Sequence, residues 1–300
     1  MEAVITIVGF LGAGKTTFLK KIIPNYITKG YNPYLILNDY ENADLDAQQF
    51  FDKLKTKQVR ALSGSCICCN GINELRNFIN KIPNRKNGVT LVEANGTSDA
   101  CSLMGFMGVG LDDRFLPPIQ ISVVDVKSWQ KREDQNDLEA NQVQTSSLIV
   151  LSHIENTSNE RIKLVSEQLI KLNSAVEIIY LDNLDVSVID KLTPSKNKGQ
   201  ELDHLKTHWS SCSVDLPSLP SSKCIYDICN SIPKSILRIK GCAQVKNEKD
   251  YIYFERTPNG EVFLRPFNGI PTTGPKLLTI GPGSNITLLK KAIEKYFVNS

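Results

Sequence analysis

The sequence has 300 residues, of which 41% are apolar and 22% are charged, as is typical of a soluble globular chain with a well-filled core. Its 35 basic and 32 acidic residues leave a net charge of +3, too balanced to favour nucleic acid or an anionic membrane as main partner. The start shows no signal-peptide pattern, and no apolar run approaches the ~18 residues of a membrane-spanning helix. We therefore expect a cytoplasmic protein.

Strand-length apolar runs alternate with segments of helical spacing in the first two thirds of the chain. The runs predict strands at 3–8, 34–37, 59–62, 89–92, 120–124, 147–151 and 176–181. The helical spacing predicts helices at 16–28, 73–82 and 160–172. Such alternation gives right-handed crossovers, so we expect an α/β fold with a mostly parallel sheet covered by helices. Functional loops would then lie at the carboxyl ends of the strands.

The composition changes in the last third, where Ser, Pro, Lys and Asn become frequent. We divide the chain into a nucleotide-binding domain at 1–190, a linker at 191–222 and a smaller α+β domain at 223–300. In that smaller domain we expect strands at 236–245, 251–256, 262–266 and 277–280, a hairpin turn at 257–260 and a helix at 287–297.

The segment 9–17 reads Gly-Phe-Leu-Gly-Ala-Gly-Lys-Thr-Thr and matches the phosphate-binding pattern G-x-x-x-x-G-K-[ST]. It follows a predicted strand and opens a predicted helix, so backbone N–H groups and the positive helix end can meet at the phosphates. Lys15 would reach the β- and γ-phosphates, and the Thr16 hydroxyl would ligate Mg²⁺. The predicted nucleotide contacts are Gly9, Gly12, Ala13, Gly14, Lys15, Thr16 and Thr17.

Acidic residues follow two of the predicted strands. Glu93 ends one strand and can hold Mg²⁺ through water, while the backbone N–H of Gly96 can sense the γ-phosphate. Asp39 and Asp46 lie after the second strand, where a carboxylate can orient the attacking water or hold Mg²⁺. We assign Lys15, Asp39 and Glu93 to catalysis, and Asp46 joins Thr16 as a predicted Mg²⁺ ligand.

Three of the eight cysteines lie within four residues, in Cys66-Ile67-Cys68-Cys69. Thiolates this close can converge on one transition-metal ion such as Zn²⁺ or Co²⁺. The fourth ligand stays open between Asp39, Glu41, a water and a partner protein. An incomplete site suits an ion that is handed on. The other cysteines are expected to be small core residues.

Together these residues resemble the CobW-like metal-chaperone GTPases, relatives of the hydrogenase and urease maturation GTPases. The phosphate loop followed by Cys-x-Cys-Cys is the most specific part, and Arg238-Ile239-Lys240-Gly241 extends the resemblance into the C-terminal domain. The resemblance implies a GTP-hydrolysing protein that uses Mg²⁺, binds Zn²⁺ or Co²⁺ at its cysteines and delivers the metal to a client metalloprotein or cofactor pathway. It also leaves open a homodimer, because relatives in this class often pair across the nucleotide.

The sequence departs from this family at the base-reading motif, where Ser152-His153-Ile154-Glu155 stands in place of Asn-Lys-x-Asp. Glu155 can still accept hydrogen bonds from guanine, and His153 can stack on the base. Asp39 also replaces the usual Glu, and Ala94-Asn95 replaces small hydroxyl residues. Two alternatives therefore stay open: ATP in place of GTP, and a nucleotide- and metal-binding docking protein with weak or no NTPase activity.

Overall fold

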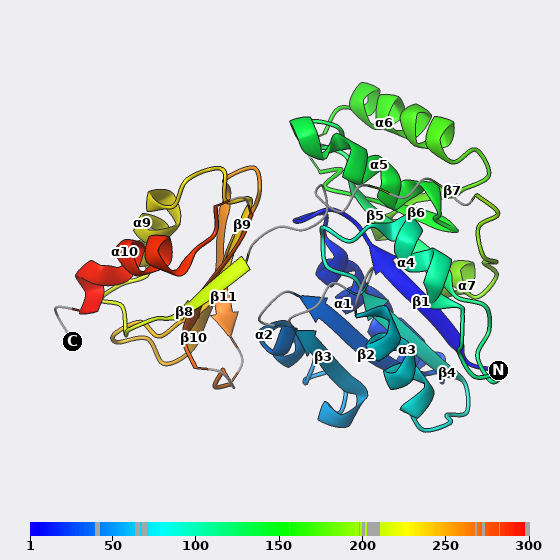
Figure 1. Ribbon diagram of the computed structural model, residues 1–300, viewed down its shortest axis with the longest axis horizontal. Helices are drawn as coiled ribbons and strands as arrows, with labels where there is room; N and C mark the ends of the chain where they lie inside the picture. The colour runs from blue at the N-terminus through cyan, green and yellow to red at the C-terminus, as the bar shows by residue number, and fades with distance from the viewer. Residues whose placement is uncertain are drawn as a thin grey trace. The chain divides into compact units, whose positions relative to one another are not determined.

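The computed structural model describes residues 1–39, 43–63, 67, 71–155, 157–197, 199, 202, 211–267, 269–271, 274–281 and 283–297. The chain divides into two compact units (Figure 1). Met1–Asp39 and Lys53–His208 form the first unit, and Tyr40–Asp52 and Trp209–Ser300 form the second. The sequence predicted one continuous domain at 1–190, whereas the structure groups residues 40–52 with the C-terminal unit.

The first unit contains a seven-stranded parallel sheet with the strand order β3-β2-β4-β1-β5-β6-β7. The strands are β1 (Ala3–Val8), β2 (Asn32–Asp39), β3 (Val59–Ser63), β4 (Gly88–Glu93), β5 (Ile119–Asp125), β6 (Leu148–Ser152) and β7 (Glu177–Tyr180). The central strands β1, β4, β5 and β6 are buried along almost their whole length, because helices cover both faces of the sheet. The predicted α/β fold is confirmed.

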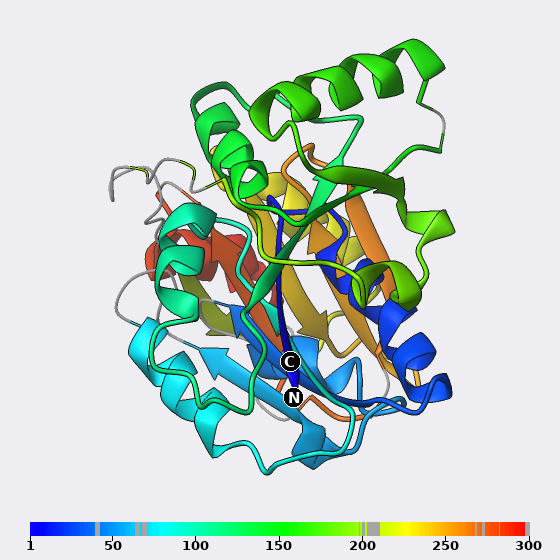
Figure 2. The ribbon, with the colours of Figure 1, turned by 90° about the vertical axis from the view of Figure 1, so that its right-hand side faces the viewer.

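Helices flank this sheet in two rows (Figures 1 and 2). They are α1 (Lys15–Thr28), α3 (Ile72–Lys81), α4 (Ala100–Met107), α5 (Asn136–Gln144), α6 (Asn159–Leu172) and the short α7 (Val186–Ile189). Along one row α3 contacts α4, α4 contacts α5 and α5 contacts α6, whereas α1 contacts α7. Val4 and Val8 of β1 face α3 and α4 within one apolar cluster, as the two-residue period of a strand requires.

Helices α4, α5 and α7 were not predicted from the sequence. In α5 the buried positions include Glu139, Asn141 and Gln142, so the helix has no apolar stripe. A search for apolar periodicity cannot find such a helix, because its inward face is polar.

The second unit contains a five-stranded antiparallel sheet with the order β11-β10-β9-β12-β8. Its strands are β8 (Ser211–Asp215), β9 (Arg238–Ala243), β10 (Tyr251–Arg256), β11 (Val262–Phe267) and β12 (Lys276–Ile280). The predicted hairpin turn at 257–260 is confirmed: Thr257 and Gly260 close it by backbone hydrogen bonds between β10 and β11. β8 was not predicted, because it falls in the segment interpreted as a linker.

Helices pack on both faces of this second sheet. α9 (Lys223–Ser231) and α10 (Ile286–Phe297) cover one face through a core that includes Phe254 and Leu277. The opposite face carries Cys242, Tyr253 and Phe267, and these contact Leu45 of α2 (Ala43–Gln48). The segment that follows β2 along the chain thus contributes a helix to the core of the second unit. Among the helices of the described residues, none is long and apolar enough to span a membrane.

Candidate nucleotide-binding site

The loop between β1 and α1 has the backbone conformation that phosphate binding requires. Gly9, Gly12 and Gly14 all have positive φ angles, of 145°, 80° and 95°. A side chain at Gly9 would overlap the backbone of Val123 in β5, so the loop passes this strand more closely than any other residue type allows. Gly14 caps α1, which begins at Lys15, and the helix N-terminus therefore opens directly onto the loop.

Lys15 lies across its own loop. Its ammonium group donates hydrogen bonds to the carbonyl oxygens of Gly9 at 2.7 Å and Phe10 at 3.4 Å, and the residue is only 4% exposed. The side chain is therefore held over the concave side of the glycine turn. A phosphate in the loop would offer it a stronger, charged acceptor in place of these carbonyls.

The predicted Mg²⁺ residues Thr16 and Glu93 are brought together by the sheet. β1 pairs with β4 so that Ile7 lies opposite Glu93, which places this carboxylate beside the start of α1. The Thr16 hydroxyl donates to Glu93 Oε1 at 3.4 Å. Two oxygen groups on neighbouring elements next to a phosphate loop form a donor set suited to a hard divalent cation.

Gly96 lies directly against the phosphate loop. A Cβ atom built on Gly96 would lie 2.7 Å from the backbone nitrogen of Leu11, so no other residue fits without a shift. Asn95 holds the turn by accepting hydrogen bonds from the backbone N–H and the hydroxyl of Thr97, both at 2.8 Å. The loop after β4 therefore packs directly against the P-loop.

Polar residues of α5 and the start of α4 anchor this same loop, and sequence reasoning missed the α5 contribution. Gln142 donates to the carbonyl oxygens of Gly96 and Ser98, each at 3.1 Å. Asp99 caps α4 by accepting from the Ser102 N–H, and it also accepts from Asn141 at 3.0 Å. The buried polar face of α5 is therefore explained by the loop that it holds.

The predicted base-reading residues Ser152 and His153 also contact the phosphate loop. The Ser152 hydroxyl donates to Ala13 O at 2.7 Å, and His153 Nε2 lies 3.0 Å from Gly12 O. His153 has a φ of 54°, which turns its backbone sharply after β6. Glu155 is exposed two residues further on. The structure thus brings Ser152 and His153 together with the P-loop and leaves the Glu155 side chain in solvent.

A buried ionic cluster supports the loop from the β5 side. The Arg132 guanidinium lies 4.3 Å from the centre of the Phe10 ring, and it pairs with Glu139 at 2.6 Å and Asp125 at 3.6 Å. Burial raises the pKa of Glu139 above its usual value, and the attraction of Arg132 opposes that shift. Arg132 and Glu139 were not predicted. They lie after β5 and within a helix that lacks an apolar pattern, so no motif marks them.

Cys66, Cys68, Cys69 and the alternative ligand Glu41 lie outside the described residues. Asp39, which is 7% exposed, ends β2 opposite Ser63, the last residue of β3. Across the part of the chain that the structure describes, no group of three or more His, Cys, Asp or Glu residues could hold a metal ion.

The isolated cysteines behave as expected of core residues. Cys101, Cys212, Cys229 and Cys242 are buried and Cys224 is partly buried. Burial raises the pKa of Cys229 and of Cys242 to about 12, so both stay protonated thiols and are poor metal ligands.

Asp46 belongs to the second unit. It lies in α2, where its Oδ2 pairs with Lys240 Nζ of β9 at 2.5 Å and its Oδ1 accepts from Gln49 at 3.0 Å. Both carboxylate oxygens of this predicted Mg²⁺ ligand therefore have protein partners in this conformation.

A parallel sheet with a glycine-rich loop leading from its first strand into a helix defines the class of P-loop nucleotide-binding proteins. Residues 3–180 match the nucleotide-binding domain of the CobW/HypB/UreG family, and the chain belongs to this family.

Two curated relatives share part of the chain. The zinc chaperone YjiA of Escherichia coli (strain K12) is 27% identical over 194 residues, which cover 62% of this chain and 59% of that protein. The zinc-regulated GTPase metalloprotein activator 1 of Dictyostelium discoideum is 24% identical over 213 residues, covering 58% of this chain and 44% of that protein. The matched part of the chain thus spans about half the length of these relatives. The crystal structure of Zn(II)-bound YjiA GTPase from E. coli aligns over 98% of both chains at 19% identity, with a TM-score of 0.42.

Proposed function

We propose that this chain is a GTP-hydrolysing metallochaperone, which binds a transition-metal ion at Cys66, Cys68 and Cys69 and delivers it to a client metalloprotein or cofactor pathway. The observation that carries the proposal is the contact of Thr16 with Glu93 beside the phosphate loop, in a chain of the CobW/HypB/UreG family. The names of the relatives, a zinc chaperone and a zinc-regulated GTPase metalloprotein activator, support zinc as the ion and GTP as the nucleotide.

The residues present fit Mg²⁺, because Thr16 and Glu93 offer oxygen atoms 3.4 Å apart at the carboxyl edge of the sheet. When bound, Mg²⁺ neutralises charge on the β- and γ-phosphates. In this proposal Thr16 is a direct ligand and Glu93 holds the ion through water. Asp46 remains a predicted ligand that would have to release Lys240 first.

The chain's own groups then act on the nucleotide. Lys15 exchanges the carbonyl oxygens of Gly9 and Phe10 for phosphate oxygens, which carry more charge. The backbone N–H of Gly96 senses the γ-phosphate, because no side chain separates this residue from the loop. Asp39 orients the attacking water at the end of the neighbouring strand β2.

The order of the strands supports a link between metal and nucleotide. β2 pairs with β4, so that Leu37 lies opposite Glu93, and on its other side β2 pairs with β3. Cys66 follows Ser63, the last residue of β3, by three residues along the chain. Nucleotide state and metal affinity would be coupled, and the coupling is reciprocal.

For the base, we propose guanine, read by Glu155 with His153 stacked on the ring. The support is the position of Ser152 and His153 against Ala13 and Gly12 of the phosphate loop. Competition between GTP and ATP for a fluorescent guanine nucleotide tests this assignment. If ATP displaced the fluorescent nucleotide at a concentration equal to or lower than that of GTP, the proposed nucleotide would be ATP.

A cytoplasmic location and a homodimer across the nucleotide belong to the same proposal. Three neighbouring thiols stay reduced in the cytosol, which is the state that binds metal. Sedimentation of the protein with GDP and with a non-hydrolysable GTP analogue tests the dimer: a monomer in both states would remove it.

The decisive experiment is a Co²⁺ titration of the reduced protein, followed by the thiolate-to-cobalt charge-transfer band. It is run without nucleotide, with Mg-GDP and with a Mg-GTP analogue, and repeated with a C66A/C68A/C69A variant. A variant with Cys224 replaced by Ser is the matched control, because this thiol is partly accessible and lies outside the cluster. We expect tighter binding with the GTP analogue, loss of the band in the triple variant and no change in the control.

Two results would overturn parts of this proposal. Equal cobalt affinity with and without nucleotide would show that nucleotide state and metal affinity are not coupled. Single-turnover measurements that show no GDP above background would favour the docking protein without NTPase activity, provided that nucleotide still binds.

A further inference from the structure

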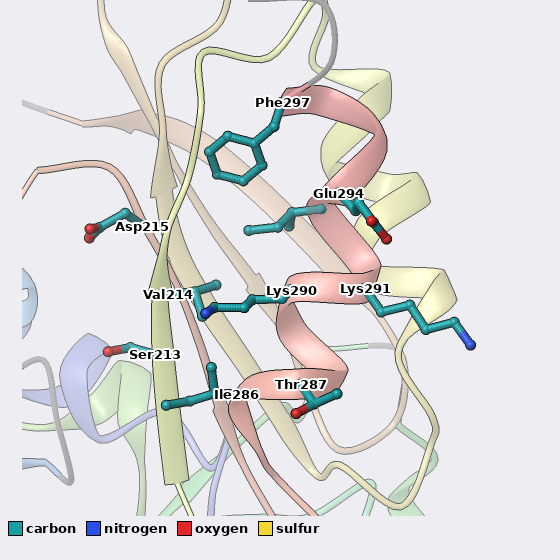
Figure 3. Close-up of a pocket in the computed structure, with 10 residues that line it drawn as sticks. Ser213, Val214, Asp215, Ile286, Thr287, Lys290, Lys291, Glu294 and Phe297 are labelled. Carbon is teal, nitrogen blue, oxygen red and sulfur yellow. The ribbon is translucent and has the colours of Figure 1, made fainter.

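A groove of about 900 Å³ lies in the second unit between the edge strand β8 and helix α10 (Figure 3). Val214 lines it from the strand, and Ile286, Lys290, Ile293 and Phe297 line it from the helix. These four helix residues follow the spacing i, i+4, i+7 and i+11, so they share one face of α10.

The outer edge of β8 offers backbone hydrogen-bonding groups to a partner. Leu216 N–H donates to Pro275 O, and the antiparallel register continues with Val214 opposite Leu277. In such a ladder, alternate residues form hydrogen bonds to the neighbouring strand. The backbone N–H and C=O groups of Val214 therefore face β12, whereas those of Ser213 and Asp215 face outward. Among the described strands none pairs with this outer edge.

Apolar residues line the groove beside this edge, together with the charged residues Asp215, Lys290, Lys291 and Glu294. Ile286 and Phe297 are each 52% exposed, at opposite ends of the helix face, and Val214 contacts the helix side of the sheet. Lys290 is exposed and extends toward Val214, whereas Lys291 points away from the groove (Figure 3). Within the described part of the chain Lys290 forms no ion pair, and the nearby Asp215 is paired with Lys276 at 2.9 Å.

We propose that β8 and α10 form a docking groove for an extended, acidic segment of a partner protein, which adds to the sheet as a further strand. Backbone groups of Ser213 and Asp215 would bond to the segment, as in other cases of strand addition. Every second side chain of the segment would point toward α10, where apolar residues meet Ile286 and Phe297 and a carboxylate meets Lys290. This inference concerns the second unit and does not depend on nucleotide or metal binding.

Charge selects a partner protein over a second copy of this chain as the occupant. The exposed charged residues of α10 are Lys290, Lys291, Glu294 and Lys295, three cations and one anion. Pairing of two β8 edges would bring two such helices to the same composite sheet and set like charges against each other. An acidic segment avoids this repulsion and neutralises Lys290.

The test uses the full chain and a fluorescein-labelled peptide of alternating Val and Thr residues that carries two Glu residues in the Val series. Binding is followed by fluorescence anisotropy, and backbone N–H exchange is followed by NMR. We expect the peptide to slow exchange at Ser213 and Asp215. Cys212 and Val214 should not change, because their N–H groups already face β12.

Two matched pairs of variants sharpen the test. K290E should weaken peptide binding about tenfold or more, while K291E, with the same charge change on the same helix, should weaken it less than about threefold. S213P removes one outward N–H and should abolish binding, whereas S213A keeps that N–H and should bind normally. Nucleotide affinity should be unchanged in all four variants, which separates this groove from the proposed nucleotide site.

Each contrary result would overturn the proposal. Equal losses in K290E and K291E would mean unspecific charge attraction. Normal binding by S213P, or no protection of the two N–H groups, would exclude strand addition. Absence of peptide binding at millimolar concentration would exclude the groove as a docking site. A dimer that S213P converts to a monomer would make a second copy the occupant.

Discussion

Buried charged side chains serve different ends in the two sheets. At the carboxyl edge of the parallel sheet, the buried Lys15 donates to carbonyl oxygens of the phosphate loop, and the partly buried Glu93 accepts from the Thr16 hydroxyl. In the antiparallel sheet, Arg256 donates to four carbonyl oxygens at the end of α9 and in the segment after it, and Lys240 pairs with Asp46. The difference teaches that burial of a charge does not identify a functional site. What identifies it is the presence of partners that a ligand can replace.

The largest effect that this comparison predicts is at Lys15. K15A should reduce single-turnover nucleotide hydrolysis by about a hundred- to a thousandfold, because the variant loses the charge that stabilises the transferred phosphoryl group. Lys21 lies on the same helix and pairs only weakly with Asp182 at 3.4 Å, so K21A is the control and should hydrolyse normally. Equal thermal unfolding midpoints would show that both variants fold. Full activity of K15A would contradict the assignment of the loop.

Arg256 should show the opposite pattern, with a large effect on stability and none on nucleotide affinity. R256A leaves the carbonyl oxygens of Cys229, Ile232, Pro233 and Ile236 without their donor in a buried region. We expect a loss of about 3 kcal/mol in the free energy of unfolding, measured by urea denaturation. R265A removes an exposed guanidinium over the Tyr253 ring and should cost much less. An unchanged urea midpoint for R256A would refute this account.

Asp46 decides whether α2 is a structural or a Mg²⁺-binding element. D46N should cost about 2 kcal/mol of unfolding free energy, because it removes the charge that Lys240 faces. D44N, on the exposed side of the same helix, should cost little. If D46N left stability unchanged and weakened Mg-nucleotide binding, the structural role would be wrong. That result would establish Asp46 as a Mg²⁺ ligand.

Glu139 gives the smallest effect, visible as a pH dependence. Its pKa is raised in the folded protein by burial, so the folded state holds this proton more tightly than the unfolded state. The contribution of this tighter proton binding to stability is therefore complete below the usual pKa of a glutamate. It is lost as pH rises through the pKa of Glu139 in the folded protein. The stability of wild type minus that of E139Q should fall over this window, as measured by urea unfolding at several pH values. A constant difference would contradict the shift.

Much of the first unit could be predicted from local sequence. The glycines at 9, 12 and 14 specify a backbone that few other residues adopt, and the buried strands are rich in Val and Ile. Glu93 and Ser152 each end a strand, and parallel strands have their carboxyl ends at the same edge of the sheet. The sequence therefore predicts that both residues lie at this edge. These features depend on neighbours along the chain, which is why a sequence reveals them.

The tertiary structure alone decided which distant residues support the site. Helix α5 could not be found by periodicity, because its inward face is polar and is satisfied by the loop after β4. The Arg132 cluster likewise combines residues from the P-loop, β5 and α5, and none of them has a local signature. Partners of this kind are chosen by packing across the fold.

The sequence by itself thus determined the class of fold, the phosphate loop and the family resemblance, because each depends on spacing along the chain. Only the tertiary structure decided that residues 40–52 belong with the C-terminal unit and that Asp46 faces Lys240 there. It also decided that none of the described strands pairs with the edge of β8 beside α10. The physical reason is the same in each case: pairing partners far apart in sequence are set by burial and by strand register, which no local pattern encodes.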